Sequence, residues 1–370
     1  MLWITNLAAP YRKPVWEALA TDHDLDVRLT SHRDAPDALG RGEDWFDLGS
    51  TVYRTTPLRV RAPAWSGNHH LPLAAGVSEL VDGADIVVLG GWEAPVYWQF
   101  LWAARRAHKP TVGFYESTLA TQNFTRGPIA RMRELFFRAL DSVVTPGLDA
   151  STALTAMGVP SPNIYTGFNA VDVTTIHDNA AAMRSGLDTR KPAPHRFLFL
   201  GQLVARKNVA SLLRAFSELP DSEATLTIVG SGPDRLGLEL LAAGLPGNQK
   251  VTFLGPVDSA TVPSLLARHD TLVLPSTEEV WGLVVNEALA AGLHVVVSRH
   301  CGVAHSVQEM RGVFVCESGA SSILERMQAS TENWQGHVPE PEILEHTPAA
   351  MAAVFRKAFD AISPSVDIVD

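Results

Sequence analysis

The chain has only two cysteines in 370 residues, Cys301 and Cys316. Two thiols so placed match neither a disulfide framework nor the spacing of a metal site. We therefore expect both to be reduced and partly buried, which is usual for proteins of the cytoplasm. A cytoplasmic location fits this pattern.

Long apolar runs are also missing. No window approaches the roughly 18 or more uninterrupted apolar residues that a membrane-spanning helix needs. The apolar start Met1–Ile4 is soon interrupted by Asn6 and Pro10. It predicts a first buried strand rather than a signal peptide.

Peripheral contact with the inner face of a membrane stays open. Residues 124–140 mix four arginines with Ile129, Met132, Phe136 and Phe137, a combination that a helix on a membrane surface can have. The interpretation we favour is a helix packed on the core by its apolar side, with a basic outer face.

The chain lacks an excess of positive charge. Its formal net charge is −10, whereas affinity for nucleic acid comes mainly from clustered Lys and Arg. We therefore expect no nucleic-acid partner. Sequences of the His-Glu-x-x-His, Walker and dinucleotide Gly-x-Gly-x-x-Gly types are missing too, which argues against a dehydrogenase.

What the sequence does have is a regular alternation of short apolar runs with longer helical patterns. This alternation is typical of β-α-β units and parallel sheets. One series of predicted strands covers residues 2–5, 26–30, 86–89, 111–114 and 142–145, and a second covers 197–200, 226–229, 251–254, 271–274 and 294–297. The pattern predicts an α/β chain with two doubly wound, Rossmann-like domains.

The boundaries follow from a polar, Ala-rich stretch between the two series. We expect a first domain over residues 1–170, a linker over 171–193, a second domain over 194–345, and a closing helix and tail over 346–370. The closing helix should pack across a domain surface. Residues 43–71 predict a long irregular excursion of the first domain, either a binding element or a decoration.

The most informative stretch runs from Pro275 to Gly292. A strand should end at Leu274, and a helix should run from about Trp281 to Ala291. Unpaired N–H groups and partial positive charge at such a helix start favour an anion, such as a diphosphate held near Gly282 and Leu283. Glu279 and Glu287 can accept hydroxyl hydrogen bonds, although either glutamate alone is as well explained by helix electrostatics.

The two glutamates stand eight residues apart inside Glu-Val-Trp-Gly-Leu-Val-Val-Asn-Glu, after Pro-Ser. This segment resembles that of the family 4 retaining glycosyltransferases, which have the GT-B fold of two Rossmann-like domains facing across a cleft. By this resemblance Glu279 contacts the donor sugar, Trp281, Gly282 and Leu283 bring backbone to sugar and phosphate, and Glu287 contacts the nucleotide ribose.

A second match is Gly201-Gln202-Leu203-Val204-Ala205-Arg206-Lys207. It is similar to the family's Gly-Arg-Leu segment followed by Lys-Gly, whose cations hold the diphosphate. Two cations at a strand end can neutralise a departing diphosphate. Lys207 matches the family's lysine, Gln202 replaces its arginine, and Arg206 supplies the missing charge.

Weaker matches complete the donor site. Gly230 and Gly232 lie in a Gly-x-Gly-Pro turn similar to the family's turn near the nucleotide, and Pro256 and Val257 lie in a segment similar to the loop beside the base. Glycine after a strand is common, so each match alone carries little weight.

In the first domain the resemblance is mainly one of architecture. The residues that follow predicted strands, and should therefore border the ligand, are Asn6, Tyr11, Arg12 and Trp92 on the acceptor side. Glu116 stands where relatives often have a histidine near the reaction centre, and we include it among the catalytic candidates.

The resemblance implies that a sugar passes from a nucleoside-diphosphate sugar to an acceptor hydroxyl with retained configuration, with no metal and no other cofactor. The acceptor would be a glycan, a lipid-linked sugar or a small glycoside. The alternatives are another GT-B enzyme, such as a sugar-nucleotide epimerase, and a catalytically silent protein that only binds the nucleotide sugar.

Overall fold

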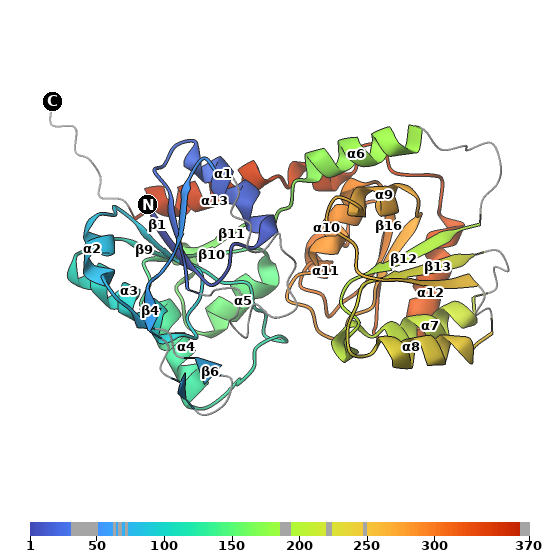
Figure 1. The fold of residues 1–370 in the computed structure, drawn as a ribbon, viewed down its shortest axis with the longest axis horizontal. Coiled ribbons are helices and arrows are strands. Elements are labelled where there is room, and N and C mark those ends of the chain that lie inside the picture. Colours follow the sequence, from blue (N-terminus) through green and yellow to red (C-terminus); the bar gives the residue numbers. More distant parts are fainter. Residues whose placement is uncertain are drawn as a thin grey trace. The chain divides into compact units, whose positions relative to one another are not determined.

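The computed structural model of the chain describes residues 1–30, 51–61, 64–65, 69–70, 73–185, 194–219, 224–246 and 250–362. It divides into two compact units: Met1–Asn169 together with the chain from Pro348, and Ala170–Thr347. Each unit has its own parallel sheet with helices on both faces (Figure 1). The predicted α/β fold of two Rossmann-like domains is thus confirmed.

The first sheet is built outward from the amino-terminal strand. Its order is β11-β10-β9-β8-β1-β2-β3, and all its strands are parallel. The strands are β1 (Leu2–Thr5), β2 (Asp26–Leu29), β3 (Arg54–Pro57), β8 (Val87–Leu89), β9 (Thr111–Phe114), β10 (Ser142–Thr145) and β11 (Ile164–Thr166). Successive strands are added on one side of β1 up to β3 and on the other side from β8 onward. The connections therefore diverge between β1 and β8, which leaves room for a ligand at the carboxyl ends of these strands.

The helices of the first unit are η1 (Pro10–Arg12), α1 (Lys13–Ala20), α2 (Val77–Asp82), α3 (Pro95–Arg106), α4 (Pro128–Arg138), α5 (Leu148–Ala156), η4 (Ser161–Asn163) and α13 (Pro348–Asp360). The closing helix α13 returns to this unit and packs against α1, β10 and β11. Phe355 on α13 lies with its ring 5.0 Å from that of Trp3 and 5.6 Å from that of Phe114. These ring contacts pack α13 against β1 and β9.

The second sheet has the order β14-β13-β12-β15-β16-β17, again all parallel. Its strands are β12 (Arg196–Leu200), β13 (Thr225–Val229), β14 (Val251–Leu254), β15 (Thr271–Leu274), β16 (His294–Ser298) and β17 (Val313–Cys316). All residues of β15 and β16 are buried, as expected for strands that helices cover on both faces. The order in which strands are added to the sheet reverses between β12 and β15.

Two groups of helices sandwich this second sheet: α7, α8 and α12 pack together, and so do α6, α9 and α10. The helical segments of the unit are α6 (Val173–Ser185), η5 (Ala205–Lys207), α7 (Val209–Ser217), α8 (Arg235–Ala243), α9 (Val262–Ala267), α10 (Leu283–Ala290), α11 (Ala304–Val307), α12 (Ala320–Glu332) and η7 (Glu342–Glu345).

About half of the excursion predicted for residues 43–71 lies outside the described residues. Its described parts include β3, β4 (Val60–Arg61), which pairs antiparallel with β7 (Leu73–Ala74), and β5 (Ala64–Trp65), which pairs antiparallel with β6 (His69–His70). The described part of this segment therefore contains short strands, which its turn-rich sequence did not predict.

Candidate functional site

The candidate site of the second unit lies at the carboxyl ends of β12 and β15, between which the order of strand addition reverses. The loop after β12 and the loop after β15 leave neighbouring strands at their carboxyl ends. A hydrogen bond of 2.8 Å from the Thr277 N–H to the Arg206 carbonyl joins the two loops. The reversal point of an open parallel sheet is the usual ligand position.

Three of the predicted residues meet at this point. Glu279 Oε2 forms an ion pair with Lys207 Nζ and a second with Arg206 Nη1, at 3.3 Å. Lys207 and Glu279 are buried on most of their side-chain surface, whereas Arg206 is exposed. One carboxylate thus faces two cations, so the cluster keeps a positive charge that an anion can neutralise.

Asn208 holds the loops of this cluster together, although it was not among the residues predicted from the sequence. Its backbone has φ +55° at the start of α7, a left-handed conformation that asparagine tolerates better than most residues. Its Nδ2 donates to the carbonyl oxygens of Pro275 and Ser318, at 3.1 and 2.7 Å. Asn208 therefore ties the loop after β12 to the loops after β15 and β17. Its side chain makes no capping hydrogen bond to α7, so its place before a helix does not reveal this role.

The α10 helix begins beside this cluster. It starts at Leu283 rather than at Trp281, because Gly282 has φ +101°, which only glycine adopts without strain. The Trp281 ring is buried, and its Nε1 donates to Asn286 Oδ1 at 3.2 Å. The Val285 N–H donates to the Gly282 carbonyl at 2.9 Å, whereas the N–H groups at the very start of an α-helix have no acceptor within the helix. In α10 these follow Glu279 by four and five residues.

Glu287 lies one turn further along α10 than Leu283 and is half-buried. Burial raises its pKa from the ordinary value of 4.5 to about 7. A carboxylate held in such surroundings gains more than an exposed one from a hydroxyl donor. Glu287 is thus a half-buried carboxylate whose surroundings oppose its charge.

The loop after β13 lies against the loop that carries Arg206 and Lys207, and the loop after β14 lies against the loop after β13. The Leu203 N–H donates to the Ser231 carbonyl at 2.8 Å, and the Gly230 N–H donates to the Gly255 carbonyl at 3.2 Å. A Cβ on Gly230 would lie 1.9 Å from the Gly201 carbonyl oxygen, so only glycine fits this crossing. Gly232 lies equally close to Leu203, with 2.2 Å between its Cβ position and the carbonyl oxygen.

The remaining donor-side candidates surround these loops at the surface. Gln202 and Pro256 are exposed, and Val257 is half-buried. Gln202 follows Gly201, at the same strand end as Arg206 and Lys207.

The first unit has its own charged cluster after β1 and β9. Arg12 Nη2 pairs with Glu116 Oε2 at 2.5 Å, and Arg12 Nη1 donates to Thr5 Oγ1 at 2.9 Å. Asn169 Nδ2 donates to Glu116 Oε1 at 3.0 Å. Burial opposes the charge of Arg12, yet the Glu116 carboxylate raises its pKa overall. Both oxygens of Glu116 are thus engaged, one by Arg12 and the other by Asn169.

The other acceptor-side candidates line the same sheet edge. Arg12 lies over the rings of Tyr11 and Phe114, at 5.7 and 5.3 Å. Asn6 Oδ1 accepts the Leu7 N–H at 2.9 Å, so its side chain shapes the turn after β1. Trp92 is half-buried, and the Arg133 guanidinium lies 5.6 Å from its ring centroid.

Cys301 and Cys316 are both free and buried. Burial raises the pKa of each thiol to about 12, so both are protonated at neutral pH and unreactive. Among the residues that the structure describes, no group of three or more His, Cys, Asp or Glu is arranged to hold a metal ion.

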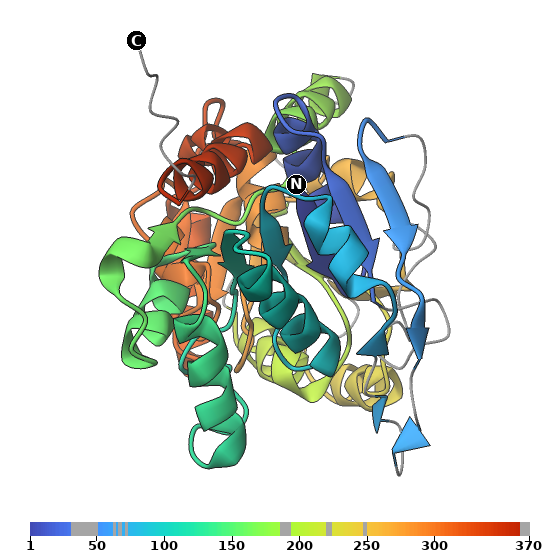
Figure 2. The same cartoon turned by 90° about the vertical axis from the view of Figure 1, so that its left-hand side faces the viewer.

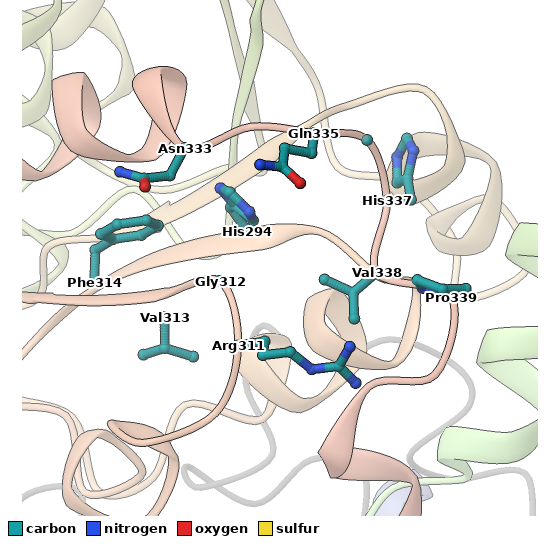
Figure 3. A pocket seen from close by; sticks show the side chains of 11 residues that line it. His294, Arg311, Gly312, Val313, Phe314, Asn333, Gln335, His337, Val338 and Pro339 are labelled. Carbon is teal, nitrogen blue, oxygen red and sulfur yellow. The ribbon is translucent and has the colours of Figure 1, made fainter.

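A pocket of about 560 Å³ lies elsewhere in the second unit. His294 and Val313 begin β16 and β17, so this pocket is at the amino ends of the strands, opposite the Lys207 cluster. Figure 3 shows the His294 ring beside Phe314 and the Arg311 guanidinium at the pocket edge. Arg311 is already paired with Glu342, at 2.5 Å.

The matches to a known family fall mainly in the second unit. Residues 188–338 match the family model described as glycosyl transferases group 1. An uncharacterized glycosyltransferase of Methanocaldococcus jannaschii is 36% identical over 139 residues, which are 37% of this chain and 36% of the relative. A GDP-mannose-dependent phosphatidylinositol dimannoside mannosyltransferase of Mycobacterium tuberculosis is 34% identical over 144 residues, 38% of this chain and 37% of the relative. The chain thus matches little more than a third of the length of these two relatives.

Among solved structures, the Anabaena protein HepE in complex with UDP superposes with a TM-score of 0.70 at 17% identity. The match covers 98% of this chain and 99% of that one. It extends over both units, and the fold that it shows is GT-B.

Proposed function

We propose that the chain transfers a sugar from a nucleoside-diphosphate sugar to an acceptor hydroxyl, with retention and without a metal, because residues 188–338 match the family model described as glycosyl transferases group 1. The observation that carries this proposal is the placement of Glu279 between Lys207 and Arg206, where the second sheet reverses. Such a site favours a ligand that combines anionic groups with hydroxyls.

The donor fits this site group by group. The diphosphate would lie against Lys207, Arg206 and the first N–H groups of α10, which together supply charge and directed donors. Glu279 would accept a hydroxyl of the sugar. Glu287, whose raised pKa reflects burial without a compensating charge, would accept the ribose hydroxyls. HepE was solved with UDP and the Mycobacterium tuberculosis relative depends on GDP-mannose, so we propose a nucleoside diphosphate without specifying its base.

The transfer step then needs no covalent enzyme intermediate. The bond between the anomeric carbon and the diphosphate oxygen breaks while the acceptor oxygen bonds to the same carbon on the same face. The acceptor proton passes to the departing diphosphate oxygen. Lys207 and Arg206 stabilise the negative charge that develops there, which is the interaction that differs most between ground state and transition state.

On the acceptor side, the Arg12 cluster of the first unit supplies a fixed cation and a rigid turn. Asn6, Tyr11 and Trp92 are the side chains that would contact the acceptor sugar, since aromatic and amide groups suit sugar faces and hydroxyls. The acceptor would be a glycan, a lipid-linked sugar or a small glycoside, and the enzyme would work in the cytoplasm.

The proposal is tested by initial rates of transfer from a sugar nucleotide that the protein binds. Lys207→Ala and Glu279→Ala should each lower kcat by about 100-fold or more, the usual effect of removing one group that stabilises a developing charge. Arg299→Ala is the matched control, because Arg299 forms an exposed ion pair with Glu317 in the same unit, and it should keep the full rate.

Near-normal turnover of both site variants, with folding verified by circular dichroism, would reject the assignment. Product analysis without acceptor separates the alternatives. An epimerase would release free sugar products in the absence of acceptor, and a silent binding protein would bind the nucleotide without any turnover.

A further inference from the structure

Exposed apolar side chains gather on one part of the first unit. Among the described residues, six of the fourteen large apolar side chains that are exposed lie between residues 102 and 135. They are Trp102, Leu119, Phe124, Ile129, Met132 and Leu135. Trp102 is 62% exposed, and Met132 and Leu135 are each 49% exposed, which is unusual for side chains of this size.

Trp102 belongs to α3, whereas Ile129, Met132 and Leu135 belong to α4, and Leu119 and Phe124 lie in the loop before α4. The Trp98 ring on α3 lies 6.2 Å from Trp102 on the same helix and 5.0 Å from Phe136 on α4. Arg105 Nη2 donates to the Ala139 carbonyl just after α4, at 2.8 Å. Figure 2 shows the two helices side by side on the outside of the sheet. We call their outer face, with the loop that precedes α4, the α3–α4 surface.

The sequence-based expectation for residues 124–140 was therefore partly wrong. Phe136 and Phe137 are buried as expected, but Ile129 and Met132 point to solvent and Arg133 is buried. Ile129, Met132 and Leu135 are three residues apart and thus lie along one side of α4. The Arg133 guanidinium is held inside by Gln122 Oε1, at 2.7 Å, and this hydrogen bond compensates its burial.

The charge of the α3–α4 surface is opposite to that of the chain. Residues 95–141 contain seven Lys or Arg and three Asp or Glu, a formal charge of +4, whereas the whole chain carries −10. Each of the three acids already has a partner: Glu116 binds Arg12, Glu134 binds Arg131, and Asp141 Oδ2 accepts from Thr111. Without the buried Arg133, this segment keeps a formal charge of +3.

A pocket at the carboxyl ends of α3 and α4 collects several of these cations. Its volume is about 600 Å³, and its lining includes Arg105, His108, Lys109 and Arg138 with Asp141 as the acid. A pocket lined in this way suits a phosphate group. Apolar side chains on the same pair of helices suit the acyl chains behind such a phosphate.

From this juxtaposition we propose that the α3–α4 surface docks on a bilayer of anionic phospholipid, with the lipid phosphate in the Arg105–Lys109–Arg138 pocket. Cations near an anionic bilayer and apolar side chains inserted at its interface add their contributions. A second copy of the chain fits less well, because a two-fold contact would place one positive surface on another. Among the described residues no helix is long and apolar enough to span a membrane, so the contact would be peripheral.

The test is cosedimentation of the whole protein with vesicles of phosphatidylcholine, with and without phosphatidylglycerol. We expect binding only to the anionic vesicles and a loss of binding as salt rises. Lys109→Gln with Arg138→Gln should weaken the partition about 25-fold, since one cation near an anionic surface contributes about fivefold, or ~1 kcal/mol. Trp102→Ser with Leu135→Ser should weaken binding as well.

The matched control is Leu236→Ser with Leu240→Ser, because these leucines of α8 are at least as exposed as Trp102 but lie in the second unit. This variant should bind vesicles like the unchanged protein. Equal binding to neutral and anionic vesicles, no binding to either, or the same loss in the control variant would overturn the proposal. So would concentration-dependent self-association that Trp102→Ser with Leu135→Ser abolishes, because it would identify a second copy as the occupant. Transfer to a soluble acceptor by the same variants keeps this outcome separate from the proposed activity.

Discussion

Glu287→Gln should stabilise the free protein while weakening donor binding. The pKa of Glu287 is raised from 4.5 to about 7 by burial, so the folded state binds a proton more tightly than the unfolded state. The buried carboxylate therefore lowers the free energy of unfolding. This loss is absent well below pH 4.5, grows as the pH rises to 7, and is complete above pH 7. At about 1.4 kcal/mol per pKa unit the penalty is at most about 3 kcal/mol, and water at the half-buried carboxylate reduces it to about 1–3 kcal/mol.

Gln has nearly the same shape and carries no charge, so Glu287→Gln should remove this penalty. For a unit of this size the unfolding midpoint should rise by about 3–10 °C at pH 8. At pH 4 the variant and the unchanged protein should melt together. The measurement is calorimetric melting at both pH values, with the exposed Glu309→Gln as the control. The affinity for the sugar nucleotide should fall about tenfold, since a hydrogen bond to a charged acceptor is lost.

A gain of the same size at pH 4 and pH 8 would show that packing, and not the buried charge, is responsible. A lower midpoint at pH 8 would refute the reasoning outright. Unchanged donor affinity would show that Glu287 does not contact the ribose and that its raised pKa reflects only its burial in the fold.

Two further predictions concern the fold. Phe355→Ala should lower the stability of the first unit by about 3–5 kcal/mol, the usual effect of removing a buried phenyl ring, because Phe355 contacts both Trp3 and Phe114; urea unfolding followed by tryptophan fluorescence measures it, and a loss below ~1 kcal/mol would mean that α13 is not fastened by this ring. Cys301 and Cys316, whose pKa values are raised to about 12 by burial, should react with a thiol reagent at neutral pH only after denaturation, and rapid labelling of the folded protein would contradict their burial.

Central strands were predictable from the sequence, and edge strands were less so. All ten predicted strands match strands of the structure, with ends that differ by at most one residue. The strands of the two main sheets that the sequence did not predict, β3, β11 and β17, each lie at the edge of a sheet. An edge strand is covered on fewer sides, so its residues need not be apolar, as Arg54–Pro57 illustrates. Apolar runs in the sequence therefore predict the interior strands of a sheet better than its edge strands.

The same logic explains what could be predicted of the site. Lys207 and Glu279 lie 72 residues apart, yet both follow a strand, and the order of an α/β sheet brings such loops together. The role of Asn208 depends on carbonyl groups from two other loops, and the pairing of Arg12 with Glu116 depends on how β1 and β9 are aligned across the sheet. Neither alignment has a local signature. The start of α10 was predicted two residues early, because only the backbone angle of Gly282 determines where the helix begins.

The central claim is that the second unit holds a nucleoside diphosphate against Lys207. It is tested most directly by thermal unfolding of the whole protein with UDP, GDP and ADP, each present far above the dissociation constant that ordinary donors have. A ligand at about 100 times its dissociation constant stabilises by about 2.7 kcal/mol, so at least one of the three should raise the unfolding midpoint by about 5–10 °C, and Lys207→Ala should remove most of that rise. No shift with any of the three nucleotides, or an equal shift in Lys207→Ala, would contradict the account.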